Sequence, residues 1–320
     1  MKYFLAVDCG GTKIASVVFD ETLKIHEKTE FSGGANAKTL SSEVLNSNIR
    51  NALTDVKNHL GDKKIEKMYG FFMHNESLFA KHGEEILDCG DVTEIPEGAL
   101  GVLCGGIYPD GALLLCGTGG DVFVIKNGSV ADIIGGWGAI LGEKGSGFAI
   151  GKAAINCAIA YHEGTGPYTV LYDRVKEKFP AESFRQSVYG IYRAPETVRE
   201  VAGYAIDVEK AAENGVGVAL GILDTAAHDL SDMVITAYRK NLLPDDFPRT
   251  FSGGVIKHDI SRTNPLMFGK ICSILKEHGI TNINTPLIPP VYGGMLYYAY
   301  TQKMPVTRDK IREYFPDAVR

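Results

Sequence analysis

The chain has 320 residues, of which 45% are hydrophobic and 22% are charged, which is an ordinary composition for a globular protein. This composition excludes a chain that is disordered, collagen-like or coiled coil throughout. The length is sufficient for two hydrophobic cores. The formal net charge is -6 and no long block of Lys or Arg occurs, so no nucleic-acid partner is expected. The sequence has no signal-peptide pattern, no membrane-length apolar run and no CxxC pair among its six cysteines, which predicts a cytoplasmic protein with free thiols and no membrane partner.

The chain opens with a strand, a glycine-rich loop and two further strands. An apolar run predicts a strand at 3–7, which leads into the loop Asp8-Cys9-Gly10-Gly11-Thr12-Lys13. Two more strands are predicted at 14–19 and near 24–30, with a polar turn between them. Glycines let backbone N–H groups approach phosphate oxygens closely, and threonine adds a hydroxyl donor. Asp8 would then lie near the phosphates, where it can hold Mg2+ through water.

The same pattern returns at residues 112–134. A strand at 112–115 leads into the loop Cys116-Gly117-Thr118-Gly119-Gly120-Asp121. Two strands follow, joined by Asn127-Gly128, which is a strong hairpin signal. The recurrence is either chance or a duplicated domain whose two loops grip one nucleotide from both sides. Neither loop has the spacing of the Walker motif GxxxxGK[ST] or of the dinucleotide motif GxGxxG.

The remainder alternates helices with strands, so an α/β fold is expected. Apolar residues at helical spacing predict helices at 39–60, at 147–163, from 194, at 217–240 and after the glycines at 293–294 up to about 303. The segment Thr250-Phe251-Ser252-Gly253-Gly254-Val255 predicts a buried strand that turns into a helix. Because no low-complexity linker is present, the domains are expected to pack around a cleft.

Five segments match a known family in order across the chain. They are DCGGTK at 8–13, CGTGG at 116–120, GGWGAILGEKGSG at 135–147, FSGGV at 251–255 and PPVYGGM at 289–295. With them the chain resembles the N-acetylglucosamine kinase branch of the BadF/BadG/BcrA/BcrD-type ATPases, in the superfamily of acetate kinases, sugar kinases, Hsp70 and actin. The first loop is shared by several sugar-kinase families, whereas GGWG followed by LGxxGSG is specific. The zinc-binding cysteine cluster of the ROK sugar kinases is missing.

The resemblance implies two ribonuclease-H-like domains, 1–115 with a returning C-terminal helix at 291–320, and 116–290. It implies Mg-ATP and an amino sugar in the cleft, phosphoryl transfer to the sugar 6-hydroxyl, and a homodimer. The nucleotide and its metal would be bound by Asp8 (also the metal ligand), Gly10, Gly11, Thr12, Lys13, Thr118, Gly119, Gly215, Gly253 and Gly254. The sugar would be bound by Asn36, Gly120, Asp121, Gly136, Trp137, Gly138 and Glu143. Without the resemblance, Asn36 reads as a loop residue, Trp137 as core, Asp121 as a solvated strand residue, and Gly253-Gly254 as a turn.

Two sites depart from the family pattern. The reaction needs a carboxylate base for the sugar hydroxyl. For this role the family uses an Asp at the end of a strand, about twenty residues before the second loop and usually after an Asn. That stretch here offers Glu97, the predicted base, with Glu94 as the alternative. In the family motif LGDEGSG the Asp binds sugar hydroxyls, whereas this chain has Glu143 and Lys144 in place of Asp and Glu. Glu97 and Glu143 each stand where the family has Asp, so each carboxylate is displaced by roughly an ångström. A displacement of this size can lower the rate about 100-fold.

Three hypotheses therefore stand side by side. The leading one is an ATP-dependent amino-sugar kinase. The second is an activator ATPase, in which Cys104 and Cys116 would help to hold an iron–sulfur cluster shared between two subunits, although each thiol also reads as a small buried hydrophobe. The third is a nucleotide- or sugar-binding protein without catalysis. The sequence does not decide which sugar is the substrate: N-acetylglucosamine, N-acetylmuramic acid, glucosamine and N-acetylmannosamine all stay possible.

Overall fold

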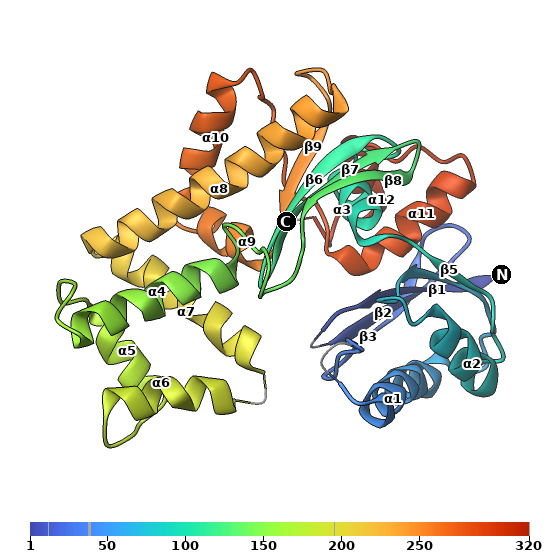
Figure 1. Cartoon of the computed structure of the whole chain (residues 1–320). Coiled ribbons are helices and arrows are strands. Elements are labelled where there is room, and N and C mark those ends of the chain that lie inside the picture. The colour runs from blue at the N-terminus through green and yellow to red at the C-terminus, as the bar shows by residue number, and fades with distance from the viewer. Residues whose placement is uncertain (12, 38–39, 195, 320) are drawn as a thin grey trace. The chain divides into compact units, whose positions relative to one another are not determined.

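The structure is a computed structural model that describes residues 1–11, 13–37, 40–194 and 196–319. The chain forms two compact units, each built on its own sheet and helices (Figure 1). Unit 1 comprises Met1–Gly111, Ile125–Val130 and Thr285–Arg320, and unit 2 comprises Ala112–Val124 and Ala131–Asn284. The predicted α/β class is confirmed.

The sheet of unit 1 has the strand order β3-β2-β1-β4-β5. Its strands are β1 Tyr3–Cys9, β2 Ile14–Asp20, β3 Ile25–Phe31, β4 Ile65–Phe71 and β5 Val92–Glu94. β1 pairs antiparallel with β2 and parallel with β4, and β4 pairs parallel with β5. The carboxyl ends of β1, β4 and β5 therefore lie at the same end of the sheet, where α/β folds place their ligands.

Helices cover both faces of this sheet. They are α1 Ser42–Leu60, α2 Glu76–Leu87, α3 Glu97–Gly105, the 3-10 turn η1 Pro290–Tyr292, α11 Gly293–Thr301 and α12 Arg308–Tyr314. Successive side chains of a strand point to opposite faces. Leu5 and Val7 thus join the apolar core beneath α1 and α2, whereas Phe4 packs on Tyr298 of α11 with ring centroids 4.5 Å apart.

The second sheet, which belongs to unit 2 apart from the β7–β8 hairpin end at Ile125–Val130, has the strand order β8-β7-β6-β9. Its strands are β6 Gly111–Cys116, β7 Gly120–Lys126, β8 Ser129–Gly135 and β9 Arg249–Ser252, with β9 parallel to β6. Asn127 and Gly128 both have positive φ, 52° and 74°. These angles are the signature of the two-residue hairpin turn that the Asn-Gly pair predicts.

Seven helices of unit 2 lie within the described residues. They are α4 Gly147–His162, α5 Val170–Lys178, α6 Phe184–Arg193, α7 Thr197–Glu213, α8 Gly217–Asn241, α9 Gly254–Ile260 and α10 Met267–Glu277. The helices predicted at 147–163 and 217–240 are confirmed as α4 and α8, and the one predicted from 194 begins at Thr197. No helix in the described part of the chain is both long and apolar enough to span a membrane.

Asp20, at the end of β2, is a buried carboxylate whose hydrogen bonds make fold stability depend on pH. Its side chain is 1% exposed and accepts bonds from the Thr22 hydroxyl at 2.6 Å and His26 Nε2 at 2.7 Å. Burial opposes ionisation, but these bonds prevail and lower the pKa of Asp20 from 3.8 to about 2. A depressed pKa stabilises the fold fully above the unfolded value, and this stabilisation is lost as pH falls through the folded value.

We expect Asp20→Asn to lower the free energy of unfolding by roughly 2 kcal/mol at pH 7, from a pKa shift of about two units. Urea titrations at pH 7, 4 and 2.5 measure this. The difference from wild type should shrink between pH 4 and pH 2.5, because over this range the Asp20 carboxyl group takes up a proton in the unfolded chain, whose pKa is 3.8, and begins to do so in the folded one. Asp62→Asn, an exposed residue in the turn after α1, is the control and should change stability little. A difference that stays constant with pH would contradict the role given to the Asp20 charge.

Candidate functional site

The first glycine-rich loop joins β1 to β2 in unit 1. Gly10 N–H donates to the Lys13 carbonyl at 2.9 Å, which closes the turn. A Cβ on Gly11 would meet no atom within 4 Å, so the loop is open at this point. Lys13 Nζ pairs with Glu30 of β3 at 2.6 Å, and both side chains are exposed. The predicted phosphate ligand Thr12 lies outside the described residues.

Two carboxyl groups with perturbed acidity lie at the carboxyl end of the unit 1 sheet. Asp8 is the next-to-last residue of β1, where burial raises its pKa to about 6 although the Lys13 charge lowers it. Glu97 is the first residue of α3, where the surrounding protein raises its pKa to about 7 and the Asp8 charge adds to the rise. The Glu97 side chain is exposed by surface area, so protein surrounds its carboxyl group without closing it off from solvent.

The neighbouring Glu94 has a structural partner, whereas Glu97 has none among the described residues. Glu94 Oε2 accepts the Phe72 N–H at 3.0 Å and so holds the turn after β4, in which Met73 and His74 have left-handed φ angles of 57° and 60°. Desolvation nevertheless raises the pKa of Glu94 to about 7. Glu97 makes no hydrogen bond or ion pair with any residue that the structure describes. One oxygen of Glu94 is therefore held by the backbone, whereas neither oxygen of Glu97 is held by a residue that the structure describes.

Asn75 is a residue of this region that sequence reasoning missed. It is buried, and its side-chain Nδ2 donates to the Ala35 carbonyl at 2.9 Å and to the Phe72 carbonyl at 3.1 Å. Ala35 N–H in turn donates to the Gly10 carbonyl at 3.1 Å. The segment that carries the predicted sugar ligand Asn36 is thus fixed to the first loop on one side and to the end of β4 on the other. The available signal is an amide residue shortly after an apolar run, four positions beyond the end of β4 at Phe71.

Three of the sequence motifs meet at the second glycine loop, in unit 2. Gly147 N–H donates to the Gly117 carbonyl at 2.8 Å, and Phe148 N–H donates to the Thr118 carbonyl at 3.1 Å, so α4 begins on this loop. Gly253, at φ 104°, rests on Cys116 so closely that a Cβ there would overlap the Cys116 carbonyl. Because these segments lie far apart in the chain, only the fold brings them together.

Four predicted sugar residues lie in this loop or beside it. Glu143 Oε2 accepts the Gly120 N–H at 2.7 Å, and a Cβ on Gly119 would lie 2.7 Å from the same oxygen. Gly136 N–H donates to the Gly120 carbonyl at 3.2 Å, and a Cβ on Gly136 would lie 3.1 Å from Asp121 Oδ2. The longer acid at position 143 is therefore in direct contact with the loop.

Trp137 and Gly138 lie in the turn that follows this contact. Trp137 N–H donates to the Gly142 carbonyl at 3.2 Å, and the Trp137 side chain is 75% exposed. The reading of Trp137 as a core residue is therefore wrong. Gly215 lies elsewhere, in the turn between α7 and α8, and its nucleotide role stays a prediction.

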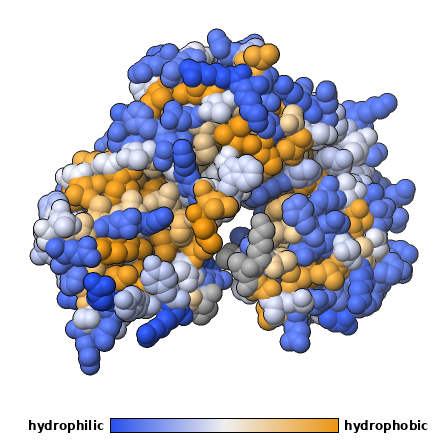
Figure 2. All heavy atoms as spheres, viewed as in Figure 1, coloured by the Kyte–Doolittle hydropathy of each residue, from blue (hydrophilic) through white to orange (hydrophobic). Residues whose placement is uncertain are grey.

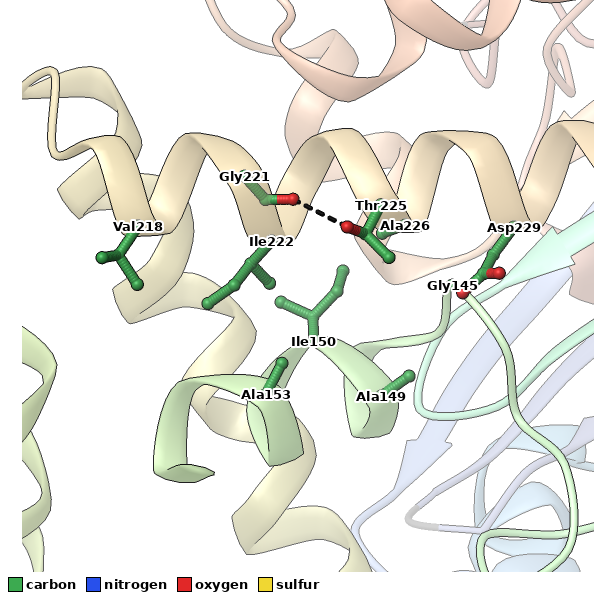
Figure 3. A pocket seen from close by; sticks show the side chains of 10 residues that line it. All are labelled: Gly145, Ala149, Ile150, Ala153, Val218, Gly221, Ile222, Thr225, Ala226 and Asp229. Carbon is green, nitrogen blue, oxygen red and sulfur yellow. Dashed lines mark hydrogen bonds between the residues drawn. The ribbon is translucent and has the colours of Figure 1, made fainter. Parts of the chain in front are cut away.

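A cavity of about 240 Å³ lies between α4 and α8 (Figure 3). Figure 2 shows apolar side chains gathered over these helices, and the cavity lining is apolar apart from Thr225 and Asp229. It includes Gly145 of the Trp-containing motif. Its side chains carry no positive charge with which to bind a phosphate, so we do not assign the nucleotide phosphates to it.

The cysteines proposed for a metal cluster are fully enclosed. Burial raises the pKa of both the Cys104 and the Cys116 thiols, and a cluster requires thiolates. In the described ranges, no group of three or more His, Cys, Asp or Glu is arranged to hold a metal ion. The reading of these thiols as small buried hydrophobes is favoured.

Known proteins resemble this chain over most of its length. The model of the BadF/BadG/BcrA/BcrD ATPase family matches residues 5–285. An N-acetylmuramic acid/N-acetylglucosamine kinase of Clostridium acetobutylicum is 24% identical over 239 residues, 72% of this chain and 77% of that one. An N-acetyl-D-glucosamine kinase of Dictyostelium discoideum is 25% identical over 273 residues, 79% of this chain and 85% of that one.

Solved structures share the fold. A candidate N-acetylglucosamine kinase from Porphyromonas gingivalis superposes with a TM-score of 0.72 at 17% identity, covering 94% of this chain and all (100%) of that one. A ROK family glucokinase from Streptomyces griseus, in complex with glucose and AMPPNP, superposes with a TM-score of 0.54 at 16% identity, covering 93% and 98%. The predicted pair of ribonuclease-H-like domains is confirmed by this likeness.

Proposed function

Because this chain belongs to the BadF/BadG/BcrA/BcrD ATPase family, we propose that it is an ATP-dependent kinase of an amino sugar, most simply N-acetylglucosamine, with the 6-phosphate as product. The two curated relatives are named as kinases of N-acetylglucosamine, one of them also of N-acetylmuramic acid. The observation that carries the proposal is Glu97, an accessible carboxylate of raised pKa with no partner of its own in the described chain.

Glu97 acts as the base in this proposal. The sugar hydroxyl oxygen forms a bond to the γ-phosphorus of ATP, the bond from that phosphorus to the β,γ-bridging oxygen breaks, and ADP leaves. The hydroxyl proton passes to the Glu97 carboxylate. A pKa of about 7 suits this step, since a base works best when its pKa lies near the working pH.

Asp8 fits the role of magnesium ligand. Its carboxylate is desolvated, and a nearby positive charge eases its ionisation, as the effect of Lys13 on its pKa indicates. Mg2+ in nucleotide sites is typically bound by one or two carboxylates together with phosphates and waters, so a single Asp is sufficient. When bound, the ion would neutralise negative charge on the ATP phosphates.

The second loop would bind phosphate and sugar through neighbouring groups. In this proposal Thr118 and the N–H groups of Gly119, Gly253 and Gly254 serve the nucleotide. The sugar residues of unit 2 are Gly120, Asp121, Gly136, Trp137, Gly138 and Glu143, and Asn36 is the sugar residue of unit 1. An exposed indole flanked by glycines offers an apolar face to a sugar ring.

ADP release with Mg-ATP tests the proposal, across N-acetylglucosamine, N-acetylmuramic acid, glucosamine, N-acetylmannosamine and a control without sugar. We expect N-acetylglucosamine to raise ADP release well above the control, and phosphorus NMR of the product to show a 6-phosphate. Release at the control rate for every sugar would reject the amino-sugar kinase. A phosphate at another hydroxyl would keep the kinase and correct the product.

Glu143→Ala should raise the KM for the sugar about tenfold and leave the KM for ATP within about twofold, because the variant removes a charged hydrogen bond to Gly120 N–H that orders the sugar side of the loop. Steady-state kinetics with each substrate varied in turn measures both constants. Lys144→Ala, at an exposed position next to it, is the matched control. Equal rises in both KM values would mean that Glu143 orders the whole loop.

A further inference from the structure

The Gly253–Gly254 turn leads into α9, a helix of only seven residues. On its other side the turn rests on the second glycine loop, where Gly253 packs against Cys116 and a Cβ on Gly117 would lie 3.7 Å from Gly254 N. A helix this short has few hydrogen bonds of its own. The position of the turn therefore depends on what holds α9.

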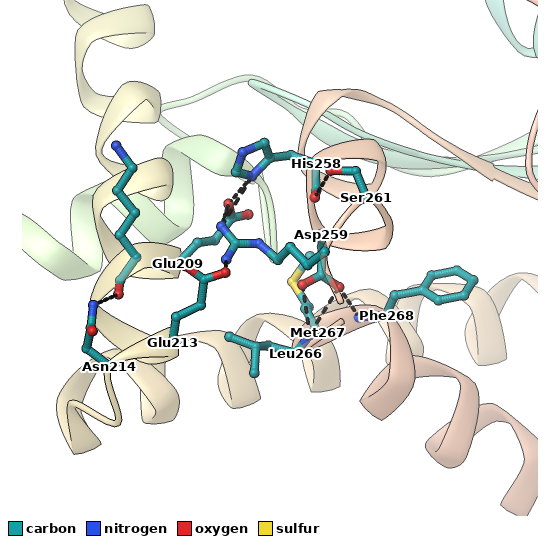
Figure 4. Close-up of polar contacts among 11 residues, drawn as sticks. Glu209, Glu213, Asn214, His258, Asp259, Ser261, Leu266, Met267 and Phe268 are labelled. Carbon is teal, nitrogen blue, oxygen red and sulfur yellow. Dashed lines mark hydrogen bonds and ion pairs between the residues drawn. The ribbon is translucent and has the colours of Figure 1, made fainter. Parts of the chain in front are cut away.

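Towards α7, α9 is held by a charged cluster. The Glu209 side chain is 3% exposed, and its Oε2 accepts from His258 Nδ1 of α9 and, at 2.9 Å, from Arg262 Nη2 just beyond α9. Arg262, 8% exposed, also pairs with Glu213 one turn further along α7. Figure 4 shows Glu209 and His258 turned towards each other from the two helices. Because a carboxylate only accepts, the Nδ1 atom carries the proton.

Towards α10, the next residue of α9 makes a second anchor. Asp259 is fully buried and accepts the backbone N–H groups of Leu266 at 2.9 Å, Met267 at 3.1 Å and Phe268 at 2.6 Å. These bonds satisfy donors at the start of α10 that have no partner within that helix. The consecutive residues 258 and 259 thus tie α9 to both of its neighbours.

We propose that Glu209 is a positioning residue for nucleotide binding, which holds His258 and Arg262 and so fixes the Gly253–Gly254 turn against the second glycine loop. The inference rests on the proposed function, in which these two glycines contact the nucleotide. A buried ion pair is weak grounds for stability, because well-packed apolar residues serve as well. Its directional bonds do fix the orientation of a short helix. The negative charge of Glu209 also reaches the loop itself, since it adds to the rise in the pKa of the buried Cys116 thiol.

The affinity for Mg-ADP, measured by calorimetric titration without sugar, tests this role. Glu209→Gln keeps the size of the side chain and removes its charge, and we expect the Kd to rise about tenfold, with a rise of about threefold for His258→Gln. The matched control is Asp207→Asn, on the same helix, which removes a carboxylate 12% exposed that pairs with Lys178 at 2.8 Å. It should change the Kd by less than about twofold. The KM for the sugar should stay unchanged in all three variants.

Wild-type Kd values in both Glu209→Gln and His258→Gln would overturn the inference. Equal losses of affinity for ADP and for the sugar would also overturn it, because they indicate that the variant disturbs the protein as a whole rather than the Gly253–Gly254 turn. If Glu209→Gln does not fold, His258→Gln decides, because its side chain is half exposed. A wild-type protein that binds no Mg-ADP would overturn both this inference and the kinase. One that binds Mg-ADP but phosphorylates no sugar would reject only the acceptor, and the Kd comparison would still decide the role of Glu209.

Discussion

Glu97→Gln is expected to lower kcat for sugar phosphorylation by at least about 100-fold, while the Kd for Mg-ADP stays within about twofold. Gln has nearly the same shape but cannot accept the hydroxyl proton. Coupled measurement of ADP release gives kcat, and calorimetry gives the Kd. Glu94→Gln is the matched control, since an amide oxygen can still accept the Phe72 N–H. If Glu94→Gln lost more kcat than Glu97→Gln, the base would be Glu94 rather than Glu97.

The pH profile offers a second view of the same residue. Only ionised Glu97 can take a proton, and its pKa is raised to about 7. We therefore expect kcat/KM to rise with pH up to about 7 and then to level off. This rising limb should be absent from the residual activity of Glu97→Gln.

Gly253→Ala is expected to lower the free energy of unfolding by about 3 kcal/mol or more and to abolish Mg-ADP binding. At φ 104° a side chain is strained by about 1–3 kcal/mol, and the overlap of its Cβ with the Cys116 carbonyl adds a similar cost. Urea unfolding followed by circular dichroism measures the stability, and calorimetry the binding.

Gly254→Ala is the matched comparison for stability. A Cβ at Gly254 would meet no atom within 4 Å, and this residue is the first of α9. We expect a change of at most about 0.5 kcal/mol. Equal destabilisation by the two substitutions would show that the contact between Gly253 and Cys116 is looser than described.

The sequence predicts secondary structure best where apolar residues repeat at helical spacing over a long segment, or where a turn has a characteristic pair of residues. The helices at 147–163 and 217–240 and the Asn127-Gly128 hairpin are found within a few residues of their predicted places. Residues 61–110 gave no such signal. β5 has only three residues and exists through its pairing with β4, and α3 contains three glycines that disfavour a helix, so burial against the sheet decides both.

The candidate site divides in the same way. The glycine motifs could be found because their residue types carry the chemistry, and the fold brings three of them together around Cys116. The bond from Glu143 to Gly120 and the choice between Glu94 and Glu97 depend on which backbone amide lies beside which carboxylate, and no local pattern encodes that. Asn75 was missed for the same reason, since its carbonyl partner Ala35 lies 40 residues away.

The helix α11 packs on the first sheet but is synthesised long after it. It covers the Phe4 and Tyr69 side of the first sheet, yet it begins at Gly293, about 200 residues after β5 ends at Glu94. At about 5–20 residues per second, the ribosome leaves that aromatic face uncovered for roughly 10–40 s. The segments of unit 2 are complete at Asn284, before α11 is made. The inserted unit can therefore finish folding first, and a nascent chain stalled before residue 293 would present its first sheet to chaperones.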